Sequence, residues 1–408
     1  MLTSLGIVLL IGMIFGWLAE RLHLPRIIGL LTAGILIGPY ALNWLQPSLL
    51  DISSDLRQMA LVIILIKAGL SLDLNDLKRV GRPAVMMSLV PASFEILGYV
   101  ILTPLLLGLD HVNAAVMGAV LAAVSPAVVV PRMVYLMEHG YGTKQSIPQM
   151  IMAGASCDDI FVIVLFTTFS HMAEGGSIQW QDFLNIPLSI VLGVGVGALV
   201  GYMLVLLQRW LQQYRVALNQ SLEVVLLLAV SFLLMALETA LKGHVPLSGL
   251  LAVVAMAAMI RAKRQPAEVQ TLSASYGKLW VAAEILLFVL VGAAVNIHYT
   301  LQAGPAALAL ILLALCFRSV GVWLCMQGTH LTQSERLFCV FAYLPKATVQ
   351  AAIGSVPLAM GLASGQLILS VAVLGILVTA PLGALLIDQS YPHLLKQNQE
   401  KGADTAEE

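Results

Sequence analysis

The stretch GASCDDIFVIVLF, residues 154–166, places two adjacent carboxylates, Asp158 and Asp159, inside an apolar run. An ionisable group within a membrane span is costly and usually faces a cavity or a partner. Neighbouring helix residues point about 100° apart, so both side chains can reach one polar cavity but not one narrow partner. Two close anions in a low-dielectric setting repel each other, which favours a protonated or cation-occupied site. The alternatives are a capped helix end and a satisfied pair at an interface.

The composition around this stretch is that of a membrane protein. Of the 408 residues, 59% are hydrophobic and 11% are charged, and the mean hydropathy is +0.92. A soluble domain is about one-quarter charged, so a soluble enzyme is excluded, and a disordered chain is excluded by the high hydrophobicity. The net charge of -1 provides no basic surface for nucleic acid. Four cysteines have no metal-ligand spacing and are interpreted as core residues: Cys157, Cys316, Cys325 and Cys339.

Apolar runs of about 20 residues predict thirteen membrane spans. The first has no basic n-region and no small-residue cleavage site, which favours a retained helix over a signal peptide. With the N-terminus outside, sixteen of the 21 Lys and Arg residues fall on the inner side, two fall on the outer side and three lie within spans. Because Lys and Arg collect on the cytoplasmic side, the N-terminus is predicted outside and the C-terminus inside. The predicted spans are 2–19, 26–42, 56–72, 83–108, 112–136, 147–171, 184–208, 219–240, 246–261, 278–297, 303–326, 335–357 and 363–388.

Two spans contain prolines that predict broken helices. The fifth reads VLAAVSPAVVVPRMVYL, with Pro126 and Pro131, and the twelfth reads VFAYLPKATVQAAIGSVPL, with Pro345. Proline removes a helix hydrogen bond and frees carbonyls, which inside a membrane must line a cavity or lie buried in protein, where they can ligate a cation. The two spans are seven apart, and an odd offset means opposite orientations, as in an inverted repeat. Simple kinks are the alternative.

Further charges lie on the spans related by the same offset and at the second break. Glu95 in the fourth span and Arg318 in the eleventh are predicted to pair across the core, where such a pair fixes geometry more than it adds stability. Either residue could instead snorkel to the interface. Lys346 at the second break can neutralise the negative ends of the broken helix, or act as a titrating carrier. Ser156 and Thr348 offer hydroxyls to a cation site, although Ser156 fits plain helix packing equally well.

Three motifs in combination carry a family likeness. SPAVVVP (125–131), ASCDDI (155–160) and LPKATVQAAIGSV (344–356) together resemble the monovalent cation:proton antiporter superfamily, most closely bacterial relatives of the animal NHA-type Na+/H+ antiporters. The resemblance covers essentially the whole membrane chain. It implies an all-α polytopic protein with the NhaA-like antiporter fold, in which inverted repeats contribute two crossing discontinuous helices. A core domain would then move against a dimerisation domain.

The resemblance also implies roles for individual residues. Asp159 matches the principal ion-binding carboxylate and Asp158 its paired aspartate, so Na+ would bind there. Thr348 and the segment around Ser125 match the unwound stretches that line the site. Glu95 and Arg318 match a core ion pair. The electrogenic double-aspartate members place a lysine where Arg318 stands, and an arginine is not deprotonated in proteins, so it cannot release a proton as that lysine is thought to.

These observations predict a secondary active antiporter that exchanges Na+ or Li+ for H+ by alternating access, and not an enzyme. A potassium/proton antiporter and a gated cation channel remain alternatives; an intramembrane aspartyl protease fits poorly because its two carboxylates come from separate helices. No cofactor is expected beyond the transported ions. The expected partners are small cations, the lipid bilayer and a second copy of the chain, in a bacterial inner membrane. The predicted organisation is a single transporter unit at 1–390 followed by a short cytoplasmic tail at 391–408. Within the unit, the core is predicted at approximately 56–171 and, in part, 278–388. The dimerisation or scaffold helices are predicted at approximately 1–42 and 184–261.

Overall fold

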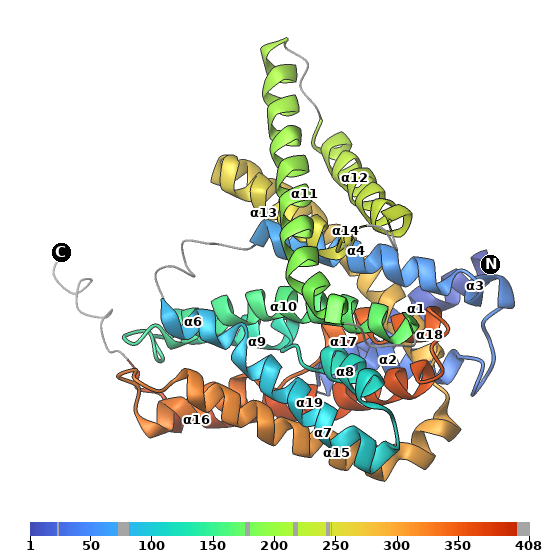
Figure 1. The fold of residues 1–408 in the computed structure, drawn as a ribbon, viewed down its shortest axis with the longest axis vertical. Helices are drawn as coiled ribbons and strands as arrows, with labels where there is room; N and C mark the ends of the chain where they lie inside the picture. The colour runs from blue at the N-terminus through green and yellow to red at the C-terminus, as the bar shows by residue number, and fades with distance from the viewer. Residues whose placement is uncertain are drawn as a thin grey trace. The chain divides into compact units, whose positions relative to one another are not determined.

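The computed structural model describes residues 1–22, 24–71, 81–175, 180–214, 219–241, 245 and 247–397. The predicted tail at 391–408 therefore lies outside the described residues from position 398 onward. Within the described ranges the regular structure is helical, apart from one isolated bridge between Tyr141 and Gln397 (Figure 1). The helices are α1 (Leu2–Arg21), α2 (Arg26–Ile37), α3 (Pro47–Leu50), α4 (Ser53–Ser71), α6 (Arg82–Met87), α7 (Val90–Leu107), α8 (His111–Leu121), α9 (Pro126–Glu138), α10 (Ile147–Gly175), α11 (Trp180–Gln213), α12 (Gln220–Leu241), α13 (Gly249–Lys263), α14 (Pro266–Ala293), α15 (Ile297–Cys325), α16 (Gln333–Ala342), α17 (Thr348–Ile353), α18 (Val356–Ala359) and α19 (Gly365–Leu394).

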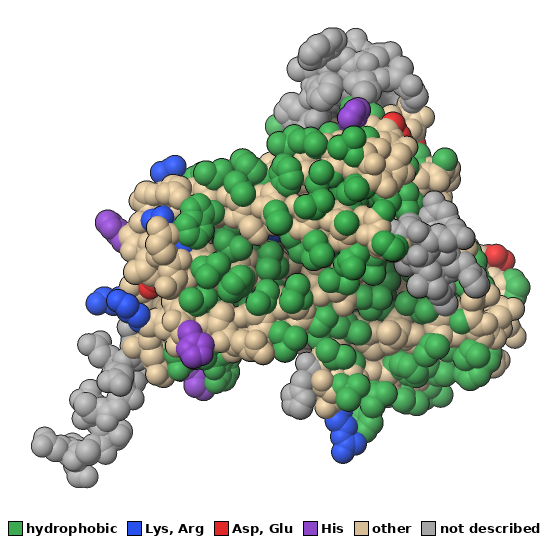
Figure 2. Space-filling model, turned by 90° about the horizontal axis from the view of Figure 1, so that it is seen from below, with side chains coloured by type: hydrophobic (Ala, Val, Ile, Leu, Met, Phe, Trp, Pro, Cys, Tyr) green, Lys and Arg blue, Asp and Glu red, His purple; other side chains and the backbone are tan. Residues whose placement is uncertain are grey.

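The helices have the length and surface of membrane spans. Eight helices in the described part of the chain are long and apolar enough to cross a membrane, and four shorter helices are also apolar. Large hydrophobic side chains are exposed, such as Leu2 at 77% and Leu105 at 78%, and Figure 2 shows hydrophobic side chains across much of the face it presents. Such a surface requires lipid, so the chain is a multi-pass membrane protein. The number thirteen stays a prediction, because some predicted spans are short or interrupted helices.

The chain divides into two compact units. The first unit comprises residues 1–72, 162–300 and 351–370, and the second comprises 73–161, 301–350 and 371–408. Within the first unit α2 packs against α1 and α14, and α13 packs against α11 and α4. Small residues permit these close approaches, as is usual between membrane helices: a Cβ at Gly34 would clash with the carbonyl of Val289, and one at Gly197 with that of Ala252.

In the second unit, local sequence signals begin and end the helices that hold the charged residues. Gly108 ends α7 with a left-handed φ of 69°, and Asp110 begins α8 by accepting hydrogen bonds from the backbone N–H groups of Val112 (3.1 Å) and Asn113 (3.2 Å). Pro126 stands in the first turn of α9, where its missing N–H costs nothing. A reciprocal capping box begins α16 at Thr332.

A buried apolar cluster in the second unit contains two of the four cysteines, Cys325 and Cys339. Cys157 is partly buried. The interpretation of Cys316 as a core residue is wrong, because its side chain is exposed on α15 and its thiol bonds the carbonyl of Leu312 at 3.4 Å. An apolar run in a membrane protein supplies both core and lipid-facing positions, since lipid is as apolar as leucine.

Candidate functional site

Two helices in the second unit are interrupted, and their interruptions meet. α8 ends at Leu121 and α9 begins at Pro126, while α16 ends at Ala342 and α17 begins at Thr348 (Figure 1). The backbone N–H of Ser125 donates to the carbonyl of Pro345 at 2.8 Å, which links one break directly to the other. Extended backbone at these points is tolerated because it is buried in protein rather than facing lipid. The structure thus has the crossing discontinuous helices that the prolines predict.

The carbonyls freed at the end of α8 are occupied by side chains of the protein. Three consecutive carbonyls each accept a hydrogen bond from a buried side chain. The pairs are Leu121 with Lys346 Nζ at 2.5 Å, Ala122 with Arg318 Nη1, and Ala123 with Gln350 Nε2 at 2.7 Å. Arg318 Nε also donates to the carbonyl of Tyr343 in the second break at 2.5 Å. These carbonyls already have protein donors, so the expectation that the breaks supply carbonyl ligands for a cation gains no support here.

Two cations and two carboxylates form a buried ionic cluster between these segments. Arg318 Nη1 lies 2.9 Å from Glu95 Oε2, and Lys346 Nζ lies 2.7 Å from Glu95 Oε1. Arg318 Nη2 lies 3.0 Å from Asp158 Oδ2. All four side chains have an exposed fraction of zero. Ion pairs this deeply buried must be hydrogen-bonded on all sides to offset the loss of hydration, and the planar guanidinium of Arg318 suits that requirement.

Asp158 is held by one of its two carboxylate oxygens. Oδ2 accepts from Arg318 and from the backbone N–H of Val124 at 2.9 Å. Val124 stands just before α9, so the carboxylate lies at the positive end of that half-helix. Oδ1 is buried and has no hydrogen-bond partner among the described residues. Asp158 is therefore fixed in place while one of its oxygens is unused.

Asp159, the next residue on α10, has no such anchor. Its side chain is partly exposed, and its Oδ1 atom is buried without a hydrogen-bond partner among the residues described. The turn of about 100° between neighbours directs it away from the position of Asp158. A buried carboxylate oxygen without a donor is costly unless a proton or a cation occupies it. Asp159 therefore has a carboxylate oxygen that a proton or a cation can occupy, whereas Asp158 is held by Arg318 and Val124.

Ser125 and Thr348 lie together at the crossing, where Ser125 Oγ and Thr348 Oγ1 are 3.5 Å apart. The backbone N–H of Thr348 also donates to Ser125 Oγ, at 3.4 Å. The side chain of Ser156 lies outside the described part of the chain, so its predicted contribution stays a prediction. The sequence reasoning did not single out Gln350, whose Oε1 is buried without a partner among the described residues. The signal that would have found it is a polar amide inside the apolar segment that follows the second break.

The fold and the site together define a class: polytopic helical membrane proteins in which two interrupted helices cross beside buried carboxylates, as in ion-coupled secondary transporters. The chain belongs to the sodium/hydrogen exchanger family, because the pattern of that family's transmembrane region matches residues 6–388. This confirms the resemblance to the monovalent cation:proton antiporters drawn from the three motifs.

Individual relatives agree with this family. Sodium/hydrogen exchanger 9B2 of Homo sapiens is 35% identical over 405 residues, covering 93% of this chain and 72% of the relative. Sodium/hydrogen exchanger 9B1 of Homo sapiens is 32% identical over 391 residues, covering 92% of this chain and 73% of the relative. The sodium proton antiporter MjNhaP1 from Methanocaldococcus jannaschii has the same fold, with a TM-score of 0.81 at 20% identity over 96% of this chain and 98% of that one.

Proposed function

We propose that the protein exchanges Na+ or Li+ for H+ by alternating access, with Asp159 as the exchangeable carboxylate and Asp158 assisting. The charge count at the crossing carries the proposal. Arg318 and Lys346 are balanced by Glu95 and Asp158, which leaves the carboxylate of Asp159 as one unbalanced negative charge. One proton or one monovalent cation restores neutrality.

Competition for this charge makes the exchange obligatory. An empty, charged site is costly to carry through an apolar barrier, whereas a site neutralised by H+ or by Na+ is not. The site therefore switches from one side of the membrane to the other only when either H+ or Na+ is bound. The fixed cluster keeps its own charges balanced in both states, so only the occupancy of Asp159 alternates. A proton gradient then drives cation efflux.

Replacement of Asp159 tests the assignment. Asp159→Asn removes the titratable charge with little change in volume, so the purified variant in proteoliposomes should fold normally and lose Na+/H+ exchange. Asp51→Asn, at an exposed aspartate between α3 and α4, is the matched control and should transport normally. Wild-type exchange by folded Asp159→Asn would refute the role of this residue.

Ion selectivity and the type of transport are tested by one measurement. Currents on a solid-supported membrane, recorded after Na+, Li+ and K+ jumps at several pH values, distinguish the sodium exchanger from a potassium/proton antiporter. They also report whether transport moves net charge. Saturable flux that stops without a counter-ion gradient supports exchange, and flux that continues without one supports the gated cation channel.

We also propose the membrane orientation and the assembly. The uneven distribution of Lys and Arg supports an outside N-terminus and a cytoplasmic C-terminus, in the inner membrane of a bacterium. The family supports a homodimer with a core domain, approximately 56–171 and part of 278–388, moving against helices at 1–42 and 184–261. Cysteine labelling of each end in intact cells tests the orientation, and the mass of the purified protein tests the dimer.

A further inference from the structure

Arg57 is a buried cation in the first unit that has no carboxylate partner among the described residues. It lies one turn into α4 with an exposed fraction of 6%. Its one hydrogen bond runs from Nη1 to the carbonyl of Leu290, at a long 3.3 Å, and Nε is buried without a partner among the residues described. Within the same described residues, no carboxylate lies within ion-pair distance of the guanidinium. A buried charge left in this way costs several kcal/mol unless something compensates it.

The guanidinium lines a cavity of about 300 Å³. The walls come from the start of α4, the end of α10, α12, α13 and the region of α18, and every lining residue belongs to the first unit. Ser170 in the wall is 2% exposed, and its hydroxyl has no partner among the described residues. His171 and Glu238 also line the cavity, and each is engaged in an interaction of its own. Arg57 and Ser170, each with a buried donor that has no partner among the described residues, therefore line one cavity.

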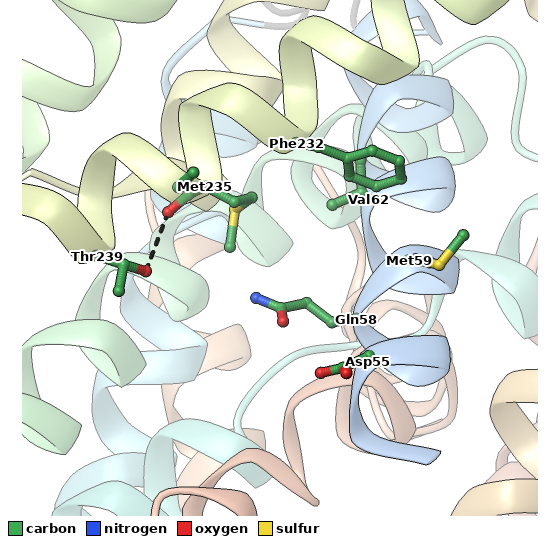
Figure 3. Close-up of a pocket in the computed structure, with 8 residues that line it drawn as sticks. Asp55, Gln58, Met59, Val62, Phe232, Met235 and Thr239 are labelled. Atoms are coloured by element: carbon green, nitrogen blue, oxygen red, sulfur yellow. Dashed lines mark hydrogen bonds between the residues drawn. The ribbon is translucent and has the colours of Figure 1, made fainter. Parts of the chain in front are cut away.

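A second cavity of about 290 Å³ shares wall residues with the first. Gln58, Met235 and Thr239 line both, so the two spaces adjoin. Val62 and Phe232 stand in the wall of the second cavity, together with the carboxylate of Asp55. Figure 3 shows Gln58 reaching from α4 toward α12, next to Asp55, while Thr239 is occupied by its own hydrogen bond to the carbonyl of Met235 at 3.3 Å. The walls of both cavities are mostly apolar.

We propose that these two cavities form a binding site for an anionic phospholipid, separate from the cation site. The lipid phosphate would accept hydrogen bonds from the Arg57 guanidinium and the Ser170 hydroxyl, and an acyl chain would lie along Val62, Phe232 and Met235. A guanidinium matches two phosphate oxygens at once, and binding pockets typically combine an apolar wall with a few fixed polar groups. The mostly apolar walls of both cavities favour a lipid over a free oxyanion.

Lipid titrations of the full chain, purified and delipidated in detergent, test the proposal. The probes are dioleoylphosphatidylglycerol, dioleoylphosphatidylcholine, oleate and inorganic phosphate. The readouts are the thermal unfolding midpoint and retention of lipid in native mass spectrometry. Phosphatidylglycerol should raise the midpoint and be retained at one copy per chain, well above phosphatidylcholine. An equal shift with inorganic phosphate or oleate would overturn the assignment to a phospholipid, and no preference for phosphatidylglycerol would overturn the site.

Variants place the effect in the cavity. Arg57→Gln should weaken phosphatidylglycerol binding about tenfold or more, because a charge-assisted hydrogen bond is lost. Met235→Trp fills the shared wall without touching the charge, and should also reduce retention. Arg209→Gln, at an exposed arginine that bonds the carbonyl of Lys263, is the matched control and should bind as the wild type does. Unchanged retention in both folded cavity variants would overturn the proposal.

Discussion

Arg57 in the first unit differs from the buried cations of the second unit in its partners. In the second unit Arg318 and Lys346 share Glu95, and Arg318 also holds Asp158, so each buried cation has a carboxylate within 3.0 Å. In the first unit Arg57 is nearly as buried, yet its one hydrogen bond to a described residue goes to a neutral carbonyl at 3.3 Å. The first arrangement is internally balanced, and the second has no balancing carboxylate among the described residues.

This difference distinguishes a structural ion cluster from a cation that can bind a ligand. A balanced cluster holds two broken helices together, and under the proposed function only the carboxylate of Asp159 is left to bind an ion. A buried cation without a carboxylate partner has an uncompensated desolvation cost, which a bound ligand of opposite charge reduces. Burial alone does not distinguish the two cases, because Arg318 and Arg57 are both buried. The number of carboxylate partners among the described residues distinguishes them.

The largest expected effect comes from removing the shared acceptor of the cluster. Glu95→Gln leaves Lys346 without a carboxylate and Arg318 with one, so the free energy of unfolding should fall by about 3–5 kcal/mol. Thermal unfolding in detergent measures this. The double variant Glu95→Gln/Lys346→Met removes the stranded charge as well and should recover part of the loss. A Glu95→Gln protein as stable as the wild type would break the contrast between the units.

A smaller loss is expected when the charge of Arg318 is kept but its shape is changed. Arg318→Lys cannot contact Glu95, Asp158 and the carbonyls of Tyr343 and Ala122 together, which should cost about 1.5–3 kcal/mol. Arg132→Lys, at a partly exposed arginine that holds Asp388 through two bonds of 2.9 Å, is the control and should cost under about 1 kcal/mol. A folded Arg318→Ala protein with altered ion coupling would instead assign this residue a role in transport.

Asp110 provides a solvated carboxylate for comparison with the buried ones. Partial burial opposes its charge, but hydrogen bonds from Asn113 and the backbone hold its pKa below its usual value. Its stabilisation is therefore present above pH about 4, the ordinary aspartate range, and is lost as the pH falls through the lowered folded-state pKa. Asp110→Ala should cost about 1 kcal/mol near neutral pH. The difference between the variant and the wild type should vanish in acid, and a constant difference across pH would contradict the capping role.

The smallest effect is expected at Arg57 in lipid-free detergent. Because no carboxylate of the described chain depends on this cation, Arg57→Gln should leave the unfolding free energy within about 1 kcal/mol of the wild-type value, or raise it. Chemical unfolding of both proteins measures the difference. A loss as large as that of Glu95→Gln would mean that Arg57 belongs to a structural network like that of the second unit.

Much of the architecture could be predicted from spacing. The prolines at 126 and 345 indicate the two breaks, because their chemistry is local and independent of context. The offset between spans placed Glu95 and Arg318 on related helices, and the structure brings them into contact. The roles of Asp158, Asp159, Ser125 and Thr348 in ion binding stay predictions.

Partners that depend on three-dimensional packing could not be predicted. The hydrogen bonds from Lys346, Arg318 and Gln350 to three consecutive carbonyls depend on how one break crosses the other, which no local pattern encodes. The sequence indicates only that Arg57 is one of the two basic residues on the predicted outer side. Its burial follows from the packing of α4 against α14, and a sequence near a span end does not distinguish a snorkelling arginine from a buried one.

The bond from the Ser125 amide to the Pro345 carbonyl ties the midpoints of two antiparallel chain segments into one joint. A tilt applied to either interrupted helix is transmitted to its counterpart without passing through a flexible loop. In the proposed transport cycle the four balanced charges around that joint would therefore move as a block. Each step would then combine a displacement of both interrupted helices with the arrival or departure of a single ion.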